Sequence, residues 1–387
     1  MFPEFSVNKV VPLRFSGVDL RLKTSHALFS SHRIDDGTML LLKTLAQRSS
    51  VPQAGRVLDA GCGVGPIAIA LKKFNPALEV VARDRLVLAA SYTAENARLN
   101  GVEVNASPGL LLENVPGPWD LIVSNLPAKA GTPVLSDFVR RSSAMLSPHG
   151  LVAVVVVEPL AAWFASEIET HAELTYREPA SGYEVFHFRS RGGTELMGHP
   201  FPEVYRRAEM DWAVGKSRLR LQTFFGLPNF DGPDYRLQVT AKLLEGLKPQ
   251  GDCLIWEPVQ GHLAAWASKS MSSKASLHIA GGDALALAAT RENLAGEQVV
   301  SHSAAFLQDL DDVPALGTVL VQLHPEPEIP WAAEAADSLR RLVAPEGKLV
   351  VNGRSTDVTR LLEHRKSFRL LKDTREKGWR AALLART

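Results

Sequence analysis

Short aliphatic runs alternate with amphipathic stretches along the chain. Strands are predicted at Val57-Leu58, at EVVARD (79–84), at Leu121-Ile122-Val123 and at LVAVVVV (151–157), and a helix is predicted at PIAIALKKF (66–74). The run at 151–157 fits a buried strand and is far shorter than a membrane span. Strands that alternate with helices in this way predict a mainly parallel, doubly wound sheet with helices on both faces.

The same pattern occurs twice in the chain. GRVLDAGCGVGPIAIAL (55–71) matches GDCLIWEPVQGHLAAWA (251–267), so Gly65 corresponds to Gly261, 196 residues later. LAASYTAENARLNG (88–101) likewise matches LALAATRENLAG (285–296). Ordered matches at a nearly constant spacing predict a tandem duplication. We therefore expect two tandem Rossmann-like α/β domains, at 1–190 and 215–387, joined by a linker at 191–214 that is rich in Gly, Pro and charge.

In the first half, VLDAGCGVG (57–65) predicts a strand that runs into a glycine turn. Gly61, Gly63 and Gly65 let the backbone turn tightly and approach a ligand. Pro66 occupies the sixth position of the dinucleotide pattern G-x-G-x-x-G, which argues against a nicotinamide cofactor. Asp59 is expected at the end of the strand, where open α/β sheets bind ligands, and its carboxylate suits a cation such as the amino group of S-adenosylmethionine.

The strand that follows ends in Asp84, 19 residues beyond Gly65. An acid at this distance, on the adjacent strand, can reach the hydroxyl groups of a ribose. Asp59, the three glycines and Asp84 together predict a site for S-adenosylmethionine.

Two further motifs suggest a family. ALFSSHRIDDGTMLLLKTL (27–45) contains the pattern F-S…D-x-G-T-x-L-L-L, and SNLPAK (124–129) follows a predicted strand. With these motifs, residues 20–190 resemble the class I methyltransferases, and most closely the bacterial enzymes that methylate guanine N2 in 16S and 23S ribosomal RNA.

The resemblance implies that residues 1–190 form the catalytic domain that binds S-adenosylmethionine, and it adds Asp36, Thr38 and Arg85 to the cofactor site. Those enzymes are also tandem duplications in which one half keeps the cofactor motif. In them the intact half is usually C-terminal, whereas here it is N-terminal.

The resemblance assigns catalysis to Asn125 and Pro127, which match two positions of the family's Asn-Pro-Pro-aromatic loop. The side-chain carbonyl of such an Asn accepts an N–H of the substrate amine and turns its lone pair toward the methyl group. Here Leu126 replaces the first proline and Ala128 replaces the aromatic ring that would stack on a base. Asn125 could otherwise only cap the turn after the strand, as Asn often does.

A second departure concerns the adenine of the cofactor. The family has an Asp that accepts from adenine N6, and Leu110 stands at about that position. We expect a backbone carbonyl to substitute for this Asp.

The second half has lost both features of the cofactor site. Glu257, Pro258 and Val259 replace the first two glycines and the residue between them, and Gly281 corresponds to Asp84. We expect 215–387 to be a degenerate methyltransferase-like domain that binds substrate, supports the first half, or does both.

Candidate RNA contacts are Lys129, beside Asn125, and the basic residues Lys216, Arg218 and Arg220 near the domain junction. Arg218 and Arg220 alternate with leucines, as on a half-buried strand, and Phe224 and Phe225 follow. Basic and aromatic residues together suit single-stranded RNA. A solvated edge beside a core cluster explains the same pattern.

The composition is compatible with a globular protein: of 387 residues, 45% are hydrophobic and 22% charged, and the net charge is +1. This balance does not indicate a strongly basic nucleic-acid binder. Two distant cysteines, Cys62 and Cys253, predict an intracellular, cytoplasmic protein without a disulfide framework, and no metal-ligand spacing is found.

Three functions remain open at this stage. The first is S-adenosylmethionine-dependent N-methylation, with guanine N2 in ribosomal RNA as the leading acceptor. The second is methylation of a protein amide or a small molecule. The third is non-catalytic RNA binding or ribosome assembly by a former enzyme. The oligomeric state is not predicted.

Overall fold

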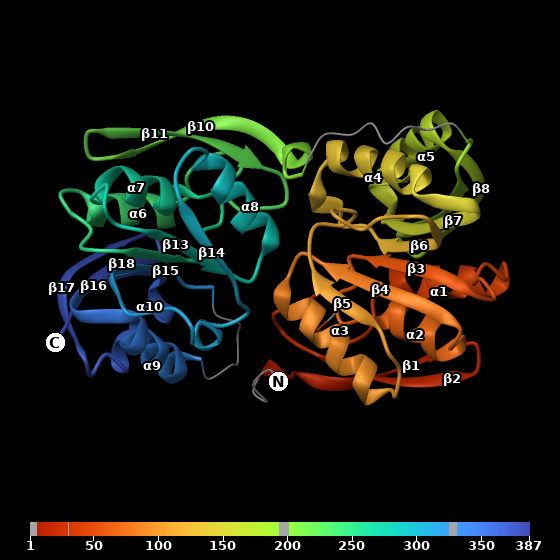
Figure 1. The fold of residues 1–387 in the computed structure, drawn as a ribbon, viewed down its shortest axis with the longest axis horizontal. Helices are drawn as coiled ribbons and strands as arrows, with labels where there is room; N and C mark the ends of the chain where they lie inside the picture. Colours follow the sequence, from red (N-terminus) through yellow and green to blue (C-terminus); the bar gives the residue numbers. More distant parts are fainter. Residues whose placement is uncertain (1–5, 30, 193–200, 325–330) are drawn as a thin grey trace. The chain divides into compact units, whose positions relative to one another are not determined.

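The computed structural model describes residues 6–29, 31–192, 201–324 and 331–387, and it divides into two compact units. Unit 1 spans Met1–Tyr205 and unit 2 spans Arg206–Thr387. Each unit contains a mainly parallel sheet with helices (Figure 1). The predicted fold, two tandem Rossmann-like α/β domains, is confirmed.

The described part of unit 1 contains a sheet with the strand order β5-β4-β3-β6-β7-β9-β8. Strands β5, β4, β3, β6 and β7 run parallel to one another, and β9 runs antiparallel to β7 and β8. The strand order reverses between β3 and β6, so their carboxyl ends form the topological switch point at which such sheets bind ligands. The strands are β3 (Gly55–Ala60), β4 (Leu78–Asp84), β5 (Asn105–Pro108), β6 (Trp119–Asn125), β7 (Leu146–Val157), β8 (Glu173–Ala180) and β9 (Tyr183–Arg189).

The helices of unit 1 follow the strands, as the sequence pattern predicts. Leu121, Ile122 and Val123 of β6 are fully buried, and so is most of the LVAVVVV run in β7. Burial on both faces of the sheet explains why these strands are continuously aliphatic. The helices are α1 (Asp36–Gln47), α2 (Pro66–Phe74), α3 (Val87–Leu99), α4 (Thr132–Ala144) and α5 (Glu158–His171), with short 3₁₀ turns η2 (Ala128–Ala130) and η3 (Glu203–Tyr205).

Unit 2 repeats this topology, with the strand order β14-β13-β12-β15-β16-β18-β17 among its described residues. Its strands are β12 (Cys253–Trp256), β13 (Leu277–Gly281), β14 (Val299–Ser303), β15 (Leu316–Gln322), β16 (Val343–Arg354), β17 (Phe368–Glu376) and β18 (Trp379–Arg386). Its helices are α6 (Tyr235–Leu244), α7 (His262–Ser270), α8 (Ala284–Asn293), α9 (Ala332–Leu342) and α10 (Ser355–Glu363), with the 3₁₀ turn η4 (Leu307–Asp309). The sequence repeat therefore corresponds to a structural repeat.

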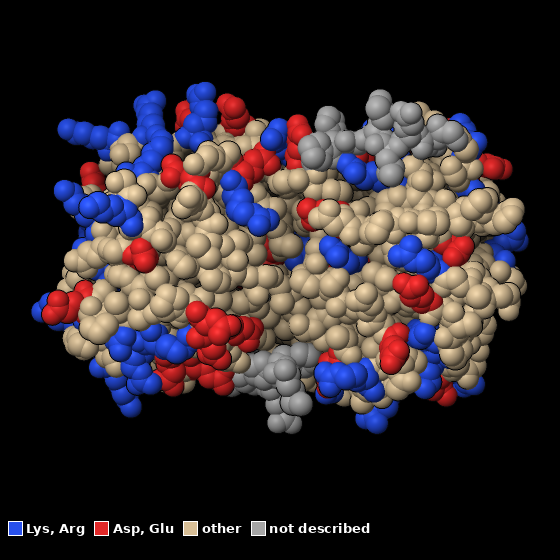
Figure 2. Space-filling view, viewed as in Figure 1, with Lys and Arg blue, Asp and Glu red and all other residues tan. Residues whose placement is uncertain are grey.

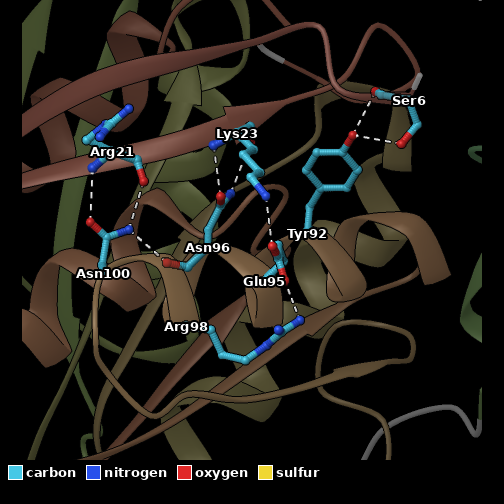
Figure 3. A network of polar contacts seen from close by, with 8 residues as sticks. All are labelled: Ser6, Arg21, Lys23, Tyr92, Glu95, Asn96, Arg98 and Asn100. Atoms are coloured by element: carbon cyan, nitrogen blue, oxygen red, sulfur yellow. Dashed lines mark hydrogen bonds and ion pairs between the residues drawn. The ribbon is translucent and has the colours of Figure 1, made fainter. Parts of the chain in front are cut away.

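Each unit also has an antiparallel hairpin that the sequence pattern did not predict. In unit 1 it consists of β1 (Lys9–Phe15) and β2 (Val18–Thr24), and in unit 2 of β10 (Arg206–Val214) and β11 (Ser217–Phe224). Figure 3 shows how side chains of α3 bind the first hairpin.

One asparagine in each unit attaches the hairpin to the domain. Asn96 exchanges two hydrogen bonds with the backbone of Lys23, at 2.8 and 3.0 Å, and donates a third to Val64 O. Asn293 makes the same contacts with the backbone of Gln222 and with Gln260 O. This shared structural role accounts for the asparagine that occurs at matching positions in both halves of the sequence.

The structure corrects the predicted linker at 191–214. Residues 206–214 form β10 of unit 2, and the division between the units falls after Tyr205. The basic and acidic residues that suggested a linker alternate along β10 with buried Trp212 and Val214. Residues 193–200 of the predicted linker lie outside the described residues. In the described ranges no helix is long and apolar enough to span a membrane.

Candidate active site

The glycine turn between β3 and α2 adopts the predicted conformation. Gly61, Gly63 and Gly65 have φ values of 90°, 57° and 88°, a region that L side chains rarely adopt. A Cβ on Gly63 would meet no atom within 4 Å, and one on Gly61 only atoms at 3.9 Å and beyond. Gly61 and Gly63 therefore leave open space where a cofactor can approach the backbone. Gly65 has a packing role, because a Cβ there would lie 2.8 Å from Ile69.

Asp84 lies beside this turn at the end of β4. Its Oδ2 accepts a hydrogen bond from Gly63 N at 2.9 Å, and its Oδ1 accepts one from Leu86 N at 2.9 Å. Burial raises the pKa of Asp84, while these two hydrogen bonds and the neighbouring Arg85 act in the opposite direction. Each carboxylate oxygen keeps a second lone pair, so Asp84 can still accept from ribose hydroxyls.

Asp59 lies beneath the turn. It is fully buried, and its Oδ2 accepts from Ala68 N of α2 at 3.0 Å. Its Oδ1 is also buried and has no hydrogen-bond partner among the described residues. Desolvation raises the pKa of Asp59 to about 7, with a small contribution from Asp84 in the same direction. The visible role of Asp59 is to hold α2 against the turn, and a contact with the cofactor's amino group remains a prediction.

Asn125 ends β6 at the switch point. Its Nδ2 donates to Asp35 Oδ2 at 2.9 Å and to Thr38 Oγ1 at 3.0 Å. Both amide hydrogens are thereby used, and nothing among the described residues donates to its Oδ1. Asn125 is only half-buried, so this oxygen is available to accept from a substrate. Pro127 follows in extended conformation and leads into η2, where Ala128 and Lys129 are exposed.

Comparison with known proteins identifies this region. The profile of the methyltransferase small domain family matches residues 19–186. Residues 19–186 are thus similar to this domain family. The matched region contains the glycine turn, Asp84 and Asn125, and so covers the whole site described above.

Relatives of this domain act on ribosomal RNA according to their names. Several proteins named ribosomal RNA small subunit methyltransferase C match it. The one from Hahella chejuensis is 39% identical over 142 residues, 35% of this chain and 40% of that protein. The one from Pasteurella multocida is 33% identical over 141 residues, 35% of this chain and 42% of that protein. The matches thus span less than half the length of these relatives.

A structural comparison extends over both units. The structure of the T. thermophilus 16S rRNA N2 G1207 methyltransferase RsmC, in complex with AdoMet and guanosine, has a TM-score of 0.67 and covers 99% of each chain. Its sequence identity is 16%. This similarity shows that the tandem architecture, and not only the methyltransferase small domain, occurs in a known protein.

Two of the residues that the resemblance assigned to the cofactor, Asp36 and Thr38, have other visible partners. Asp36 forms an exposed ion pair with Arg33 at 2.7 Å. Thr38 is buried and its hydroxyl accepts from Asn125, so its visible partner is Asn125. Asp35 was missed by the sequence analysis, although it is the first residue of the D-x-G-T pattern. It is the N-cap of α1, and this position turns its side chain inward.

The loop after β5 contains Leu110, and the expected backbone carbonyl in place of the family's Asp stays a prediction. Leu110 is buried, and Leu111 approaches the position that a Cβ on Gly61 would take, at 4.0 Å. The loop therefore lies near the glycine turn and presents an apolar side chain to it rather than a carboxylate.

Unit 2 retains the shape of the turn without its glycines. Glu257 and Val259 have φ values of 54° and 55°, so they keep the left-handed conformation at strained, non-glycine positions. The carboxylate of Glu257 accepts from Gly282 N at 2.9 Å. A Cβ on Gly281 would lie 3.1 Å from Glu257 Oε1. The Glu257 side chain thus lies against the position that corresponds to Asp84, which agrees with the predicted loss of the cofactor site.

The candidate RNA contacts differ in their surroundings. Lys216 and Arg218 are exposed on the β10–β11 hairpin, whereas Arg220 lies near two acids, Asp211 at 3.3 Å and Glu209 at 3.7 Å. Figure 2 shows basic side chains projecting along the edge where Figure 1 places β10 and β11, interspersed with acidic ones. Cross-strand pairing therefore neutralises part of this predicted basic patch.

The predicted aromatic contribution to this patch is also corrected. Phe224 is fully buried and cannot stack on a base. The guanidinium of Arg207 lies over the rings of Phe225 and Phe230, at 5.1 and 4.7 Å from their centroids. Phe230 is among the exposed large apolar residues. In the described part of unit 2, these three residues combine a cation with accessible rings.

Proposed function

We propose that this protein is an S-adenosylmethionine-dependent N-methyltransferase that acts on guanine N2 in ribosomal RNA. The observation on which this rests is the orientation of Asn125, whose carbonyl oxygen is free at the carboxyl end of β6 while both amide hydrogens are bound. The names of the relatives and the tandem architecture shared with the T. thermophilus enzyme support the choice of RNA.

The residues of the glycine turn fit the cofactor. Gly61 and Gly63 provide backbone without Cβ atoms in the way, and Asp84 provides acceptors for the ribose hydroxyls. The buried Oδ1 of Asp59, which has no hydrogen-bond partner among the described residues, is a candidate acceptor for a cationic group close to the turn, and such a cation would oppose the raised pKa of this carboxyl. When bound, S-adenosylmethionine supplies a methyl group on a sulfonium.

Asn125 would orient the acceptor amine. The lone pair of guanine N2 is delocalised into the ring, so the amine is a poor nucleophile. Its two N–H groups need two acceptors, and Asn125 Oδ1 and a backbone carbonyl of the loop at 125–127 can provide them. Holding both hydrogens fixes the direction of the lone pair, and this orientation is the contribution of the protein to the rate.

A methylated protein amide or small molecule is the second candidate. It is favoured by Ala128, which is exposed where the family has a stacking ring. Stacking contributes about 1–3 kcal/mol per base, so its loss weakens the case for a nucleobase. A non-catalytic RNA-binding role is the third candidate and is opposed by the open glycine turn and by Asp84. We propose that unit 2 contacts the RNA, with Lys216 and Arg218 as phosphate contacts, and that the protein acts in the cytoplasm.

The test is to identify the acceptor by radioactive transfer. The purified full-length protein and methyl-labelled S-adenosylmethionine are incubated separately with ribosomal RNA, ribosomal proteins and a small-molecule extract. We expect label in the RNA fraction. Label in protein or in small molecules would favour the second candidate, and cofactor binding without any transfer would contradict the assignment to an amine acceptor.

A further inference from the structure

Asp35 links three elements of unit 1 at the end of β6. Its Oδ2 accepts from Gly37 N and Thr38 N, at 3.0 and 3.3 Å, and thereby caps α1. The same oxygen accepts from Asn125 Nδ2 at 2.9 Å. Its Oδ1 accepts from the hydroxyl of Tyr183, the first residue of β9, at 2.8 Å. One carboxylate thus connects the helix cap, the candidate catalytic asparagine and the β-hairpin at the sheet edge.

The carboxylate determines which end of the Asn125 amide faces the substrate. An Asn side chain can rotate by half a turn and exchange its oxygen and nitrogen with little change in shape. In the reversed orientation, Asn125 Oδ1 would face the Asp35 carboxylate, and two acceptors at hydrogen-bond distance repel each other. Asp35 therefore keeps Nδ2 inward and Oδ1 outward. An outward NH₂ group would be a donor and could not accept from an amine.

Tyr183 holds the carboxylate in place. Burial, together with the hydrogen bond to Asp35 and its charge, raises the pKa of Tyr183 to about 12, so the hydroxyl remains a donor at neutral pH. A Cβ at residue 37 would lie 2.7 Å from the Tyr183 ring. Gly37 is thus needed for the ring to pack against the start of α1, which gives the glycine of the D-x-G-T pattern a physical reason.

The second repeat shows what happens when this arrangement is not kept. Asp234 caps α6 as Asp35 caps α1, and it accepts from Leu237 N at 2.9 Å. Two residues later, Arg236 stands in place of Gly37, and its guanidinium lies over the ring of Trp379, the first residue of β18, at 5.6 Å. The cap remains, whereas the small residue and the tyrosine hydroxyl are absent. The complete hydrogen-bond network around the helix cap thus occurs in unit 1, where the glycine turn is intact.

We propose that Asp35, anchored by Tyr183, is a positioning residue that orients the carboxamide of Asn125 so that the site accepts an N–H donor. This inference rests on the proposed function for its kinetic consequence, but the orientation itself can be measured without any reaction. It also predicts the substrate class: the acceptor is an amine with a free N–H, and an acceptor without one is not aligned.

The experiment compares Asp35→Ser with Asp234→Ser in the full chain. Serine keeps the helix cap, but it is too short to reach Asn125 and Tyr183. We expect Asp35→Ser to lower kcat roughly tenfold or more with an unchanged dissociation constant for S-adenosylmethionine, and Asp234→Ser to leave both unchanged. Tyr183→Phe, which keeps the ring, should lower kcat less than Asp35→Ser. Asp35→Asn keeps one carbonyl oxygen that can accept from Asn125, so it should retain most of the wild-type activity.

Nuclear magnetic resonance provides the readout that does not depend on activity. The side-chain NH₂ signals of Asn125 are assigned by their absence in Asn125→Ala. We expect them to exchange slowly with solvent in the wild type and rapidly in Asp35→Ser. If these signals are the same in both proteins, or if Asp35→Ser lowers only the melting temperature, the inference is wrong. If they change as expected while the wild type transfers no methyl group to RNA, the proposed function fails and the positioning role stands.

Discussion

Asn125 is the residue on which the proposed chemistry depends most, because its free carbonyl oxygen is the proposed acceptor for the substrate amine. Asp84 is its counterpart on the cofactor side, with each oxygen bound to one backbone N–H. Asn125 is the last residue of β6 and Asp84 is the last residue of β4, so both lie at the same edge of the sheet. Substitutions at them should therefore have separable effects, one on the chemical step and the other on cofactor binding.

Asn125→Ala is expected to lower kcat on the order of a hundredfold, about 3 kcal/mol, because an oriented acceptor is lost that acts mainly in the transition state. Cofactor affinity, measured by calorimetry, should change little. Asn125→Asp keeps an acceptor but adds a negative charge and loses the donors to Asp35 and Thr38, so it should retain low activity above that of the alanine variant. Wild-type kcat in Asn125→Ala would make this residue a turn residue only.

Asp84→Ala is expected to weaken S-adenosylmethionine binding by roughly 2–3 kcal/mol, because charge-assisted hydrogen bonds to the ribose are lost. Calorimetry measures this directly and also gives the stoichiometry, which we expect to be one cofactor per chain. Asp283→Ala is the matched control, since Asp283 accepts from Leu285 N in unit 2 as Asp84 accepts from Leu86 N. Equal losses in both variants, or two cofactors per chain, would contradict a single site in unit 1.

At the scale of elements, the turn between strand and helix distinguishes the two repeats. In unit 1, glycines adopt the left-handed conformation and leave space, whereas in unit 2 Glu257 and Val259 adopt it with side chains present. From the missing glycines, the sequence predicts that unit 2 has no cofactor site. It could not predict that the turn keeps its shape, because that depends on packing that overrides the local preference of the residues.

Other elements were only partly predictable. In the hairpin β10–β11, the buried residues Trp212 and Leu219 face each other across the strands, and Arg220 lies near Asp211 and Glu209 of the partner strand. Without the strand register, the charges suggested a linker and an RNA surface. Asp35 and Asp36 are adjacent in sequence, and only the N-cap geometry decides which of them points inward.

The pH dependence of the stability of Glu257→Gln tests whether Glu257 is buried in the degenerate turn. Burial raises the pKa of Glu257 to about 7, from 4.5 for an exposed glutamate, partly opposed by the hydrogen bond from Gly282. The folded protein therefore holds this proton over a pH range in which the unfolded chain releases it, and stability is lost as the pH rises from about 4.5 to 7. Relative to wild type, the Gln variant should gain about 3 kcal/mol in the free energy of unfolding across this range.

Denaturant unfolding of the full chain between pH 4.5 and 8 measures this difference. Glu363→Gln, at an exposed glutamate of α10, is the control and should leave the pH dependence of stability unchanged. A constant difference between Glu257→Gln and wild type over the range would mean that Glu257 is not buried in its protonated form.

At the scale of the whole molecule, each unit has its own core. Among the described residues, a cluster of buried residues that includes Leu41, Ile69 and Leu121 lies in unit 1, and separate clusters lie in unit 2. The duplication was readable in the sequence because both cores need the same order of aliphatic strands. The division after Tyr205 could not be predicted from the sequence, because Val204 and Tyr205 are buried residues of unit 1 within a Pro- and charge-rich stretch.

A chain truncated after Tyr205 is expected to fold and to bind S-adenosylmethionine with the full-length affinity, because the turn, Asp84 and the core all lie in unit 1. On ribosomal RNA its kcat/KM should be much lower than that of the full chain, because the proposed RNA contacts of unit 2 are missing. Circular dichroism and calorimetry check the fold and the cofactor site, and labelling of RNA checks the activity. Full-length kcat/KM in the truncated protein would exclude a role of unit 2 in substrate binding.

The central claim, that unit 1 methylates the exocyclic amine of guanine in ribosomal RNA through Asn125, is tested most directly by identifying the modified nucleoside. Ribosomal RNA from cells that lack the protein is incubated with the full chain and labelled S-adenosylmethionine, digested to nucleosides and separated by mass and retention time. The account predicts N2-methylguanosine as the labelled product with the wild type and nearly none with Asn125→Ala. Label on a ring carbon or on a ribose oxygen, or equal labelling by the two proteins, would contradict it.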